Sequence, residues 1–254
     1  LYDIVALTKL VHKGRLSLDK TVADYFPELV GVIDNAKKIT LRQMVQHKSG
    51  IPNFTGAPNF WANPTETFDE SIALIKGKPA NFKPGKKYEY CNTNYLLINK
   101  IMDNVLGYHN FQYIQEEILT PLNLKNTFGS LKQVNIEHVM SGYHIGHPHD
   151  LKTDDHGMHA TAEDVAIFVR ALNDGSVFKK GEKEIYASLY EYEHSGWVPG
   201  YQSFAKYHKD LDAVIVEFYN TTDSKLYNWN ISEIVNNRIE KIVRLKTNQR
   251  NMSN

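Results

Sequence analysis

The spacing of apolar residues changes after residue 200, and this change constrains the fold more than any other feature of the sequence. Before it, apolar residues recur every three or four positions, most clearly over residues 95–107, which indicates a buried helix. After it, residues 202–207 and 213–219 are β-type runs that residues 208–210 join as a hairpin. A final helix follows. Helices, then antiparallel strands, then a helix is an order typical of an α+β fold.

Local signals set the ends of several helices. Thr40 and Gln43 have the spacing of a capping box, in which each side chain satisfies a free backbone amide. Thr161 is placed to cap a helix that runs to Leu172, and Gly14 to end the helix that opens the chain. Further helices are expected at about residues 69–76 and 111–119, whereas residues 129–160 show no clear period. The last helix is expected to carry its aliphatic residues on one side: Ile231, Ile234, Val235, Ile239, Ile242 and Val243.

The charge balance excludes some classes of partner. Lysine and arginine together number 29, as do aspartate and glutamate, so the formal net charge is zero. A neutral chain offers no basic field to nucleic acid, and we expect no nucleic-acid partner. No apolar run approaches the roughly 20 residues that cross a bilayer, so we expect no membrane span in this chain. The single cysteine, Cys91, excludes an internal disulfide.

Three segments carry longer patterns. The first comprises residues 10–19, with a glycine–basic–leucine turn, and residues 40–52, which contain His47-Lys48-Ser49-Gly50-Ile51-Pro52. The second runs from Phe82-Lys83-Pro84-Gly85 into Tyr90-Cys91-Asn92, and the third is His194-Ser195-Gly196-Trp197. Together they resemble the serine β-lactamase and penicillin-binding-protein-like family, which includes class C β-lactamases, D-alanyl-D-alanine carboxypeptidases and esterases. The resemblance covers nearly the whole chain.

The resemblance implies roles for six residues. Tyr90 would be the phenol that moves protons, and Asn92 the amide that orients the substrate. His194 and Trp197 would also be catalytic, with the Trp197 N–H as one oxyanion donor, and Ser195 and Gly196 would bind substrate on the same strand. A tyrosine titrates near pH ~10, but a neighbouring lysine ammonium favours the phenolate, which can take a proton from a serine hydroxyl. Tyr90 and the strand at His194 are expected to face each other across one groove.

The same resemblance implies a β-lactamase/transpeptidase-like fold in one domain, residues 1–254. A helical lobe would cover about residues 12–170, and an α/β lobe about residues 171–247 together with the helix at 1–13, with the N-terminal part of its antiparallel sheet missing. The implied reaction is acyl-enzyme hydrolysis of an amide, a β-lactam or an ester, in a small molecule or a peptide. No cofactor is implied.

The nucleophile of this family is a Ser-x-x-Lys pair on the first helix, and its lysine would fall immediately before Leu1. Ser17 and Lys20 have the spacing but follow the glycine that ends the helix. Ser203 and Lys206 have it on an expected strand, where side chains alternate between faces. The chain is therefore expected to be an N-terminally truncated fragment, inactive alone. The family is periplasmic or secreted, and no signal segment is present in this chain.

Two other classes of function stay open. The protein could be a non-catalytic relative that binds peptide or cell-wall ligands. A metal-dependent hydrolase would use the histidines at 144, 147, 149, 156 and 159 with the aspartates at 150, 154 and 155. The second metal motif that such an enzyme needs is out of register, so no metal site is predicted. The patterns do not separate a β-lactamase, a D-alanyl peptidase, a D-amino-acid amidase and an esterase.

Overall fold

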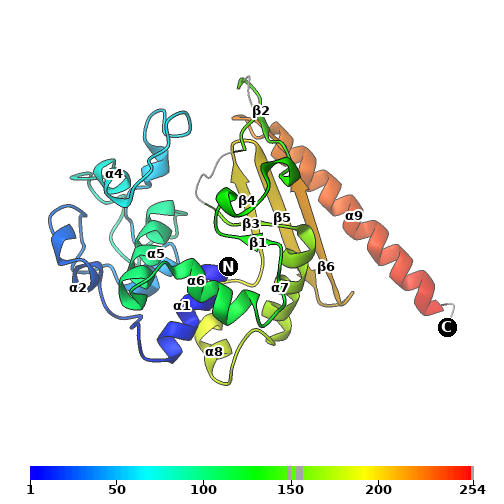
Figure 1. Cartoon of the computed structure of the whole chain (residues 1–254), viewed down its shortest axis with the longest axis horizontal. Helices are drawn as coiled ribbons and strands as arrows, with labels where there is room; N and C mark the ends of the chain where they lie inside the picture. The colour runs from blue at the N-terminus through cyan, green and yellow to red at the C-terminus, as the bar shows by residue number, and fades with distance from the viewer. Residues whose placement is uncertain (148–149, 153–156, 253–254) are drawn as a thin grey trace. The chain divides into compact units, whose positions relative to one another are not determined.

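The computed structural model describes residues 1–147, 150–152 and 157–252. The chain forms two compact units (Figure 1). Unit 1 consists of Leu1–Ile118 and Phe178–Tyr190, and unit 2 of Leu119–Val177 and Glu191–Asn254. The lobe boundaries expected near residues 13 and 170 stay a prediction. The α+β class is confirmed, because helices precede a three-stranded antiparallel sheet that a last helix follows.

Unit 1 is helical. Its helices are α1 (Tyr2–His12), α2 (Val22–Tyr25), α3 (Leu41–Val45), α4 (Phe68–Ala73), α5 (Asn92–Leu106), α6 (Asn110–Ile114) and α8 (Glu182–Ala187). A turn of π-helix, Gln115–Leu119, follows α6, so the single helix expected at 111–119 is two pieces. The short helices α2 and α8 were not expected from the sequence.

Helix α1 is held by apolar packing and by one buried ion pair. Ile4, Leu7 and Leu10 lie on one face and are fully buried. Lys9 is buried as well, and its Nζ lies 2.9 Å from Glu182 Oε2 at the start of α8. This charge pair fixes α1 against a segment more than 170 residues away in the chain.

The start of α3, which the Thr40–Gln43 capping box predicted, is confirmed. The Thr40 hydroxyl accepts the Gln43 N–H and the Gln43 side chain accepts the Thr40 N–H, as a capping box requires. The buried helix expected at 95–107 is α5, which begins three residues earlier and ends at Gly107 in the left-handed conformation.

Unit 2 contains the sheet. Its order is β4 (His194–Val198), β5 (Tyr201–His208) and β6 (Ala213–Tyr219), all antiparallel. Thr161 caps α7 (Ala162–Asp174), which packs on β5 and β6. The stretch with no clear period forms strands of only two residues each: β1 (Thr127–Phe128) pairs with β3 (His159–Ala160), and β2 (Tyr143–His144) pairs with β7 (Thr221–Thr222).

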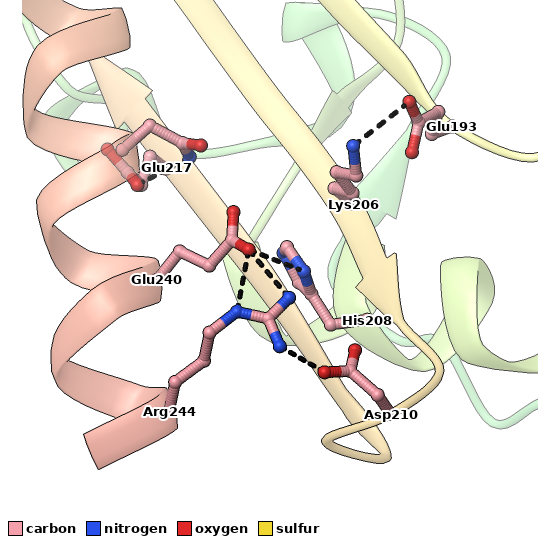
Figure 2. Close-up of polar contacts among 8 residues, drawn as sticks. Glu193, Lys206, His208, Asp210, Glu217, Glu240 and Arg244 are labelled. Atoms are coloured by element: carbon pink, nitrogen blue, oxygen red, sulfur yellow. Dashed lines mark hydrogen bonds and ion pairs between the residues drawn. The ribbon is translucent and has the colours of Figure 1, made fainter. Parts of the chain in front are cut away.

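Helix α9 (Tyr227–Met252) runs beside β6, as the red helix in Figure 1 shows. Charged side chains fasten it to the β5–β6 hairpin (Figure 2). Arg244 binds Glu240 at 2.7 Å and also pairs with Asp210. The Glu240 carboxylate lies 3.6 Å from the ring of His208, and Asn236 donates to Glu217 at 2.7 Å.

The expectation that α9 carries its aliphatic residues on one side is wrong. Val235, Ile239 and Val243 are partly buried on the sheet side. Ile231, Ile234 and Ile242 lie on another face and are each more than half exposed. Among the described residues, no helix combines the length and the apolar character that crossing a membrane requires.

Candidate active site

The loop that leads to Tyr90, residues 81–89, is hydrogen-bonded to the corner at residues 47–50, which follows α3. Three backbone hydrogen bonds join the two: Asn81 N–H to Gly50 O at 2.9 Å, Gly85 N–H to Lys48 O at 2.8 Å, and Glu89 N–H to His47 O at 2.9 Å. Gly50 has a φ of +76°, and a Cβ there would overlap the carbonyl oxygen of Phe82. The His47–Gly50 corner is therefore the support on which the loop before α5 is built.

Tyr90 itself is 49% exposed. Desolvation raises the pKa of Tyr90 above its ordinary value, and the nearby Tyr88 and Cys91 raise it further. The phenol of this chain therefore keeps its proton at neutral pH. The phenolate that the resemblance implies for a proton acceptor would require a cation beside the ring.

Asn92 is the first residue of α5 and is partly buried. Its backbone N–H donates to Asn53 Oδ1 at 3.1 Å, and its side-chain Nδ2 donates to Thr55 Oγ1 at 3.0 Å. The second bond fixes which way the amide points and leaves its oxygen as the atom that accepts from a ligand. This arrangement suits a residue that orients a substrate N–H group.

The neighbours of Asn92 have structural roles. Cys91 is buried, its thiol donates to Ile51 O at 3.2 Å, and burial raises the pKa of that thiol, so it is a poor nucleophile. Asn94 also has a structural role. It lies inside α5, fully buried, and accepts the Ser49 hydroxyl at 2.6 Å.

In unit 2, strand β4 presents the other four predicted residues. The turn Pro199-Gly200 connects it to β5, and Gly200 has the positive φ of +90° that the second central position of a type II turn needs. In a two-residue hairpin the flanking pair, Val198 and Tyr201, is hydrogen-bonded, and pairs then alternate along the ladder. Ser195 and Trp197 fall in the alternate pairs, so their N–H groups point away from β5.

This register matters because the outer edge of β4 pairs with no strand among the described residues. The register directs the Trp197 N–H toward that edge, which is the direction that an oxyanion donor at Trp197 requires. Gly196 faces Ser203 across the ladder, and a Cβ on Gly196 would lie 2.8 Å from Ser203 Oγ. A side chain at position 196 would therefore force the Ser203 hydroxyl to move.

His194 begins β4 and is exposed by its surface area, while protein atoms near the ring still shield part of it from water. Desolvation by surrounding protein lowers its pKa below the ordinary imidazole value, so His194 is neutral at pH 7. A neutral imidazole both donates and accepts a hydrogen bond, which suits a group that binds a substrate carbonyl or carboxylate.

A buried network behind β4 was not found from the sequence. The Thr222 hydroxyl accepts the Gly200 N–H at 2.7 Å and lies 2.8 Å from His144 Nδ1. The His144 ring also packs edge-on against Trp197, with 6.0 Å between ring centroids. The network therefore ties the β4–β5 turn and the Trp197 ring to the segment before α9. Its residues are scattered over 80 positions, and no local pattern joins them.

The metal hypothesis finds no support among the described residues. His149, His156, Asp154 and Asp155 lie outside them. His144 Nε2 lies 3.1 Å from Ser224 Oγ, so both of its ring nitrogens contact hydroxyls. In the described parts of the chain, no group of three or more potential metal ligands comes together.

The Ser-x-x-Lys spacings lie outside helices. Ser17 and Lys20 flank a turn after α1, and Ser203 and Lys206 lie on β5, where Lys206 pairs with Glu193 at 3.4 Å. The sequence contains a third pair with this spacing, Ser176 and Lys179, in the turn segment between α7 and α8. None of these pairs stacks its two side chains one helical turn apart.

Comparisons with known proteins identify the family. The model of the β-lactamase family matches residues 4–205. Protein flp of Staphylococcus aureus strain MW2 is 31% identical over 144 residues, which is 56% of this chain and 28% of that protein. A putative D-alanyl-D-alanine carboxypeptidase of Escherichia coli K12 is 28% identical over 129 residues, or 48% of this chain and 30% of that protein. The chain thus spans less than a third of the length of these two relatives.

Solved structures agree on the fold. D-amino acid amidase from Ochrobactrum anthropi SV3 superimposes with a TM-score of 0.79 at 20% identity, covering 96% of this chain and 83% of the amidase. A D-stereospecific amidohydrolase from Streptomyces gives 0.75 at 22% identity, covering 87% and 79%. The chain has the β-lactamase/transpeptidase-like fold and belongs to the β-lactamase family of serine hydrolases.

Proposed function

We propose that the protein containing this chain is a serine hydrolase that acts through an acyl-enzyme on an amide, β-lactam or ester. In this proposal Tyr90 moves the proton, Asn92 orients the substrate, the Trp197 N–H binds the oxyanion, and His194, Ser195 and Gly196 line the substrate strand. The observation that carries the proposal is the family match over residues 4–205, which includes all six of these residues.

The proposal requires a change in the protonation of Tyr90. Its pKa is raised in this chain, and a phenol that keeps its proton cannot accept one from serine. A lysine ammonium beside the ring would lower that pKa, and the lysine of a helical Ser-x-x-Lys pair is the proposed source. The nucleophile and the cation are therefore proposed to come together on the same helical turn.

The 254-residue chain alone is expected to form no acyl-enzyme, because none of its Ser-x-x-Lys pairs lies on a helix. Incubation with a fluorescent penicillin and with an activated D-alanyl ester, followed by intact-mass measurement, tests this. The expected result is no added mass, and a stoichiometric adduct would overturn the expectation.

The decisive experiment reads the coding sequence immediately upstream of Leu1 and expresses the chain with that stretch. A Ser-x-x-Lys pair ending beside Leu1 should yield a penicillin or ester adduct on that serine. In the extended protein, Tyr90→Phe should lower kcat by about 10²–10⁴-fold, the usual contribution of a positioned proton-transfer group. Any other upstream sequence would overturn the hydrolase proposal in favour of a non-catalytic ligand binder.

A second candidate function is a non-catalytic ligand binder, favoured by the raised pKa of Tyr90 in this chain. Such a protein would bind a D-alanyl peptide reversibly through Asn92 and the open edge of β4, with no covalent adduct. Calorimetric titration with D-alanyl-D-alanine peptides separates the two, because a binder saturates without consuming its ligand.

A further inference from the structure

His47 contacts three consecutive residues of the Tyr90 loop. Its backbone oxygen accepts the Glu89 N–H at 2.9 Å. Its ring stacks on Tyr90, with centroids 4.4 Å apart and planes inclined by 28°. Its Nδ1 accepts the Cys91 N–H at 3.1 Å. His47 thus restrains the Tyr90 ring and the residues on either side of it, through its own ring and its backbone carbonyl.

The surroundings of His47 make this support rigid. The residue is completely buried at the end of α3. Its ring also stacks on Tyr95 of α5, with centroids 5.1 Å apart, and the Tyr95 hydroxyl donates to Val45 O at 3.3 Å. Because the His47 ring packs both on Tyr90 in the loop and on Tyr95 in α5, it has few alternative rotamers.

The hydrogen bond from Cys91 determines the tautomer of His47. A backbone N–H can only donate, so Nδ1 must present its lone pair, and the ring proton is on Nε2. The backbone of His47 lies in the left-handed region, with φ at +53°. Histidine and asparagine occupy this region more readily than most residues other than glycine.

We propose that His47 is a positioning residue for the reaction, which sets the orientation of the Tyr90 phenol. This inference rests on the proposed role of Tyr90. Because His47 is buried, it does not touch the substrate and acts only through Tyr90. A half-exposed phenol on a loop must be held within about 0.5 Å of its working position to transfer a proton efficiently, and the three contacts supply that restraint.

Two variants separate the contacts. His47→Asn keeps an acceptor near the place of Nδ1 and tolerates the left-handed backbone, but removes the stacked ring. His47→Ala removes both the acceptor and the ring. The readout is the ¹⁹F resonance of 3-fluorotyrosine placed at position 90 in the 254-residue chain. The control is the same label at Tyr25, whose hydroxyl donates to Ser17 O at 3.0 Å.

The Tyr90 signal should shift and broaden in His47→Asn and more so in His47→Ala, while the Tyr25 signal stays in place. An unchanged Tyr90 signal in a folded His47→Ala protein would overturn the proposal. If His47→Ala does not fold, amide exchange in the unmodified chain decides. The Cys91 and Glu89 amides should exchange at least about tenfold more slowly than in an unstructured peptide, and unprotected amides would overturn the proposal.

Activity of the N-terminally extended protein separates this inference from the proposed function. His47→Asn should lower kcat at least about tenfold with little change in KM, and should have no further effect in a Tyr90→Phe background. A large effect of Tyr90→Phe with none from either His47 variant would defeat the positioning role alone. If Tyr90→Phe left kcat unchanged, the proposed function would be wrong, and the contacts of His47 with Tyr90 would have no role in catalysis.

Discussion

At the scale of single residues, the candidate site depends on side chains that other residues restrain. Tyr90 is stacked on a buried ring, and Asn92 has its amide nitrogen held by Thr55. Gly50 is required because the backbone carbonyl of Phe82 occupies the space of a Cβ, whereas a Cβ at Gly196 would displace the Ser203 hydroxyl. Each of these positions fixes a functional group or the backbone that carries it, so substitutions there have local, measurable effects.

Tyr90 should titrate above the ordinary tyrosine range. The difference in tyrosinate absorbance between the chain and its Tyr90→Phe variant should show a step above about pH 10. Because the folded pKa exceeds the unfolded one, the contribution of Tyr90 to stability is complete below about pH 10 and is lost as pH rises through the folded pKa. Urea unfolding at several alkaline pH values should show a larger loss in the parent chain than in Tyr90→Phe, in which other tyrosines with raised pKa values still titrate. A step below pH 10 would contradict the prediction.

Gly50→Ala should destabilise the chain more than Gly31→Ala. Both glycines have positive φ, +76° and +84°, so both pay the backbone cost of about 1–2 kcal/mol for a left-handed residue. A Cβ at Gly31 meets nothing within 4 Å, whereas at Gly50 it overlaps the Phe82 carbonyl. The overlap should add about 1–3 kcal/mol. Thermal unfolding of the two variants measures the difference, and equal losses would contradict the argument.

At the scale of elements, an ion pair between residues far apart in the sequence holds α1 in place. Helix α1 is amphipathic, but its Lys9 and the Glu182 of α8 lie almost completely out of water. The Glu182 carboxylate also accepts the Lys179 N–H at 2.8 Å, so it orders the turn into α8. An ion pair of this kind is costly to break, because the partner left behind remains a buried charge.

Lys9→Met should therefore reduce the free energy of opening of α1 by about 3–5 kcal/mol. The double variant Lys9→Met with Glu182→Met should recover most of that loss, since two apolar side chains replace the pair. Native-state hydrogen exchange of the α1 amides reports the opening free energy of this element alone. If the double variant were as unstable as the single one, the loss would come from packing rather than from an orphaned charge.

Elements with local signals were predictable, and those held by distant residues were not. The Thr40–Gln43 capping box needs only neighbours, and it was confirmed. Asn94, by contrast, is fixed by the hydroxyl of Ser49, 45 residues away, which no local pattern indicates. Helix α8 begins at Glu182, a charged residue whose burial depends on Lys9. The sequence located the Tyr90 loop and β4, but neither the stacking on His47 nor the network behind β4 has a local pattern.

At the scale of the whole molecule, unit 2 leaves apolar surface uncovered. Ile231, Ile234, Ile242 and Leu245 form a stripe along α9, and each is more than half exposed. Within the described residues, β6 pairs with β5 on one edge and with no strand on the other. Contiguous apolar surface and an open strand edge both favour association between chains.

The isolated chain should therefore associate as its concentration rises, and charge placed on the stripe should suppress this. Ile234→Lys with Ile242→Lys removes two exposed aliphatic side chains without touching the sheet side of α9, so the thermal midpoint should change little. Asn230→Lys with Asn237→Lys, at two other exposed positions of the same helix, adds the same charge and controls for charge alone. Sedimentation velocity over a concentration series measures the outcome. If all three proteins associate equally, the stripe does not drive association, and the open edge of β6 is the surface that remains to be tested.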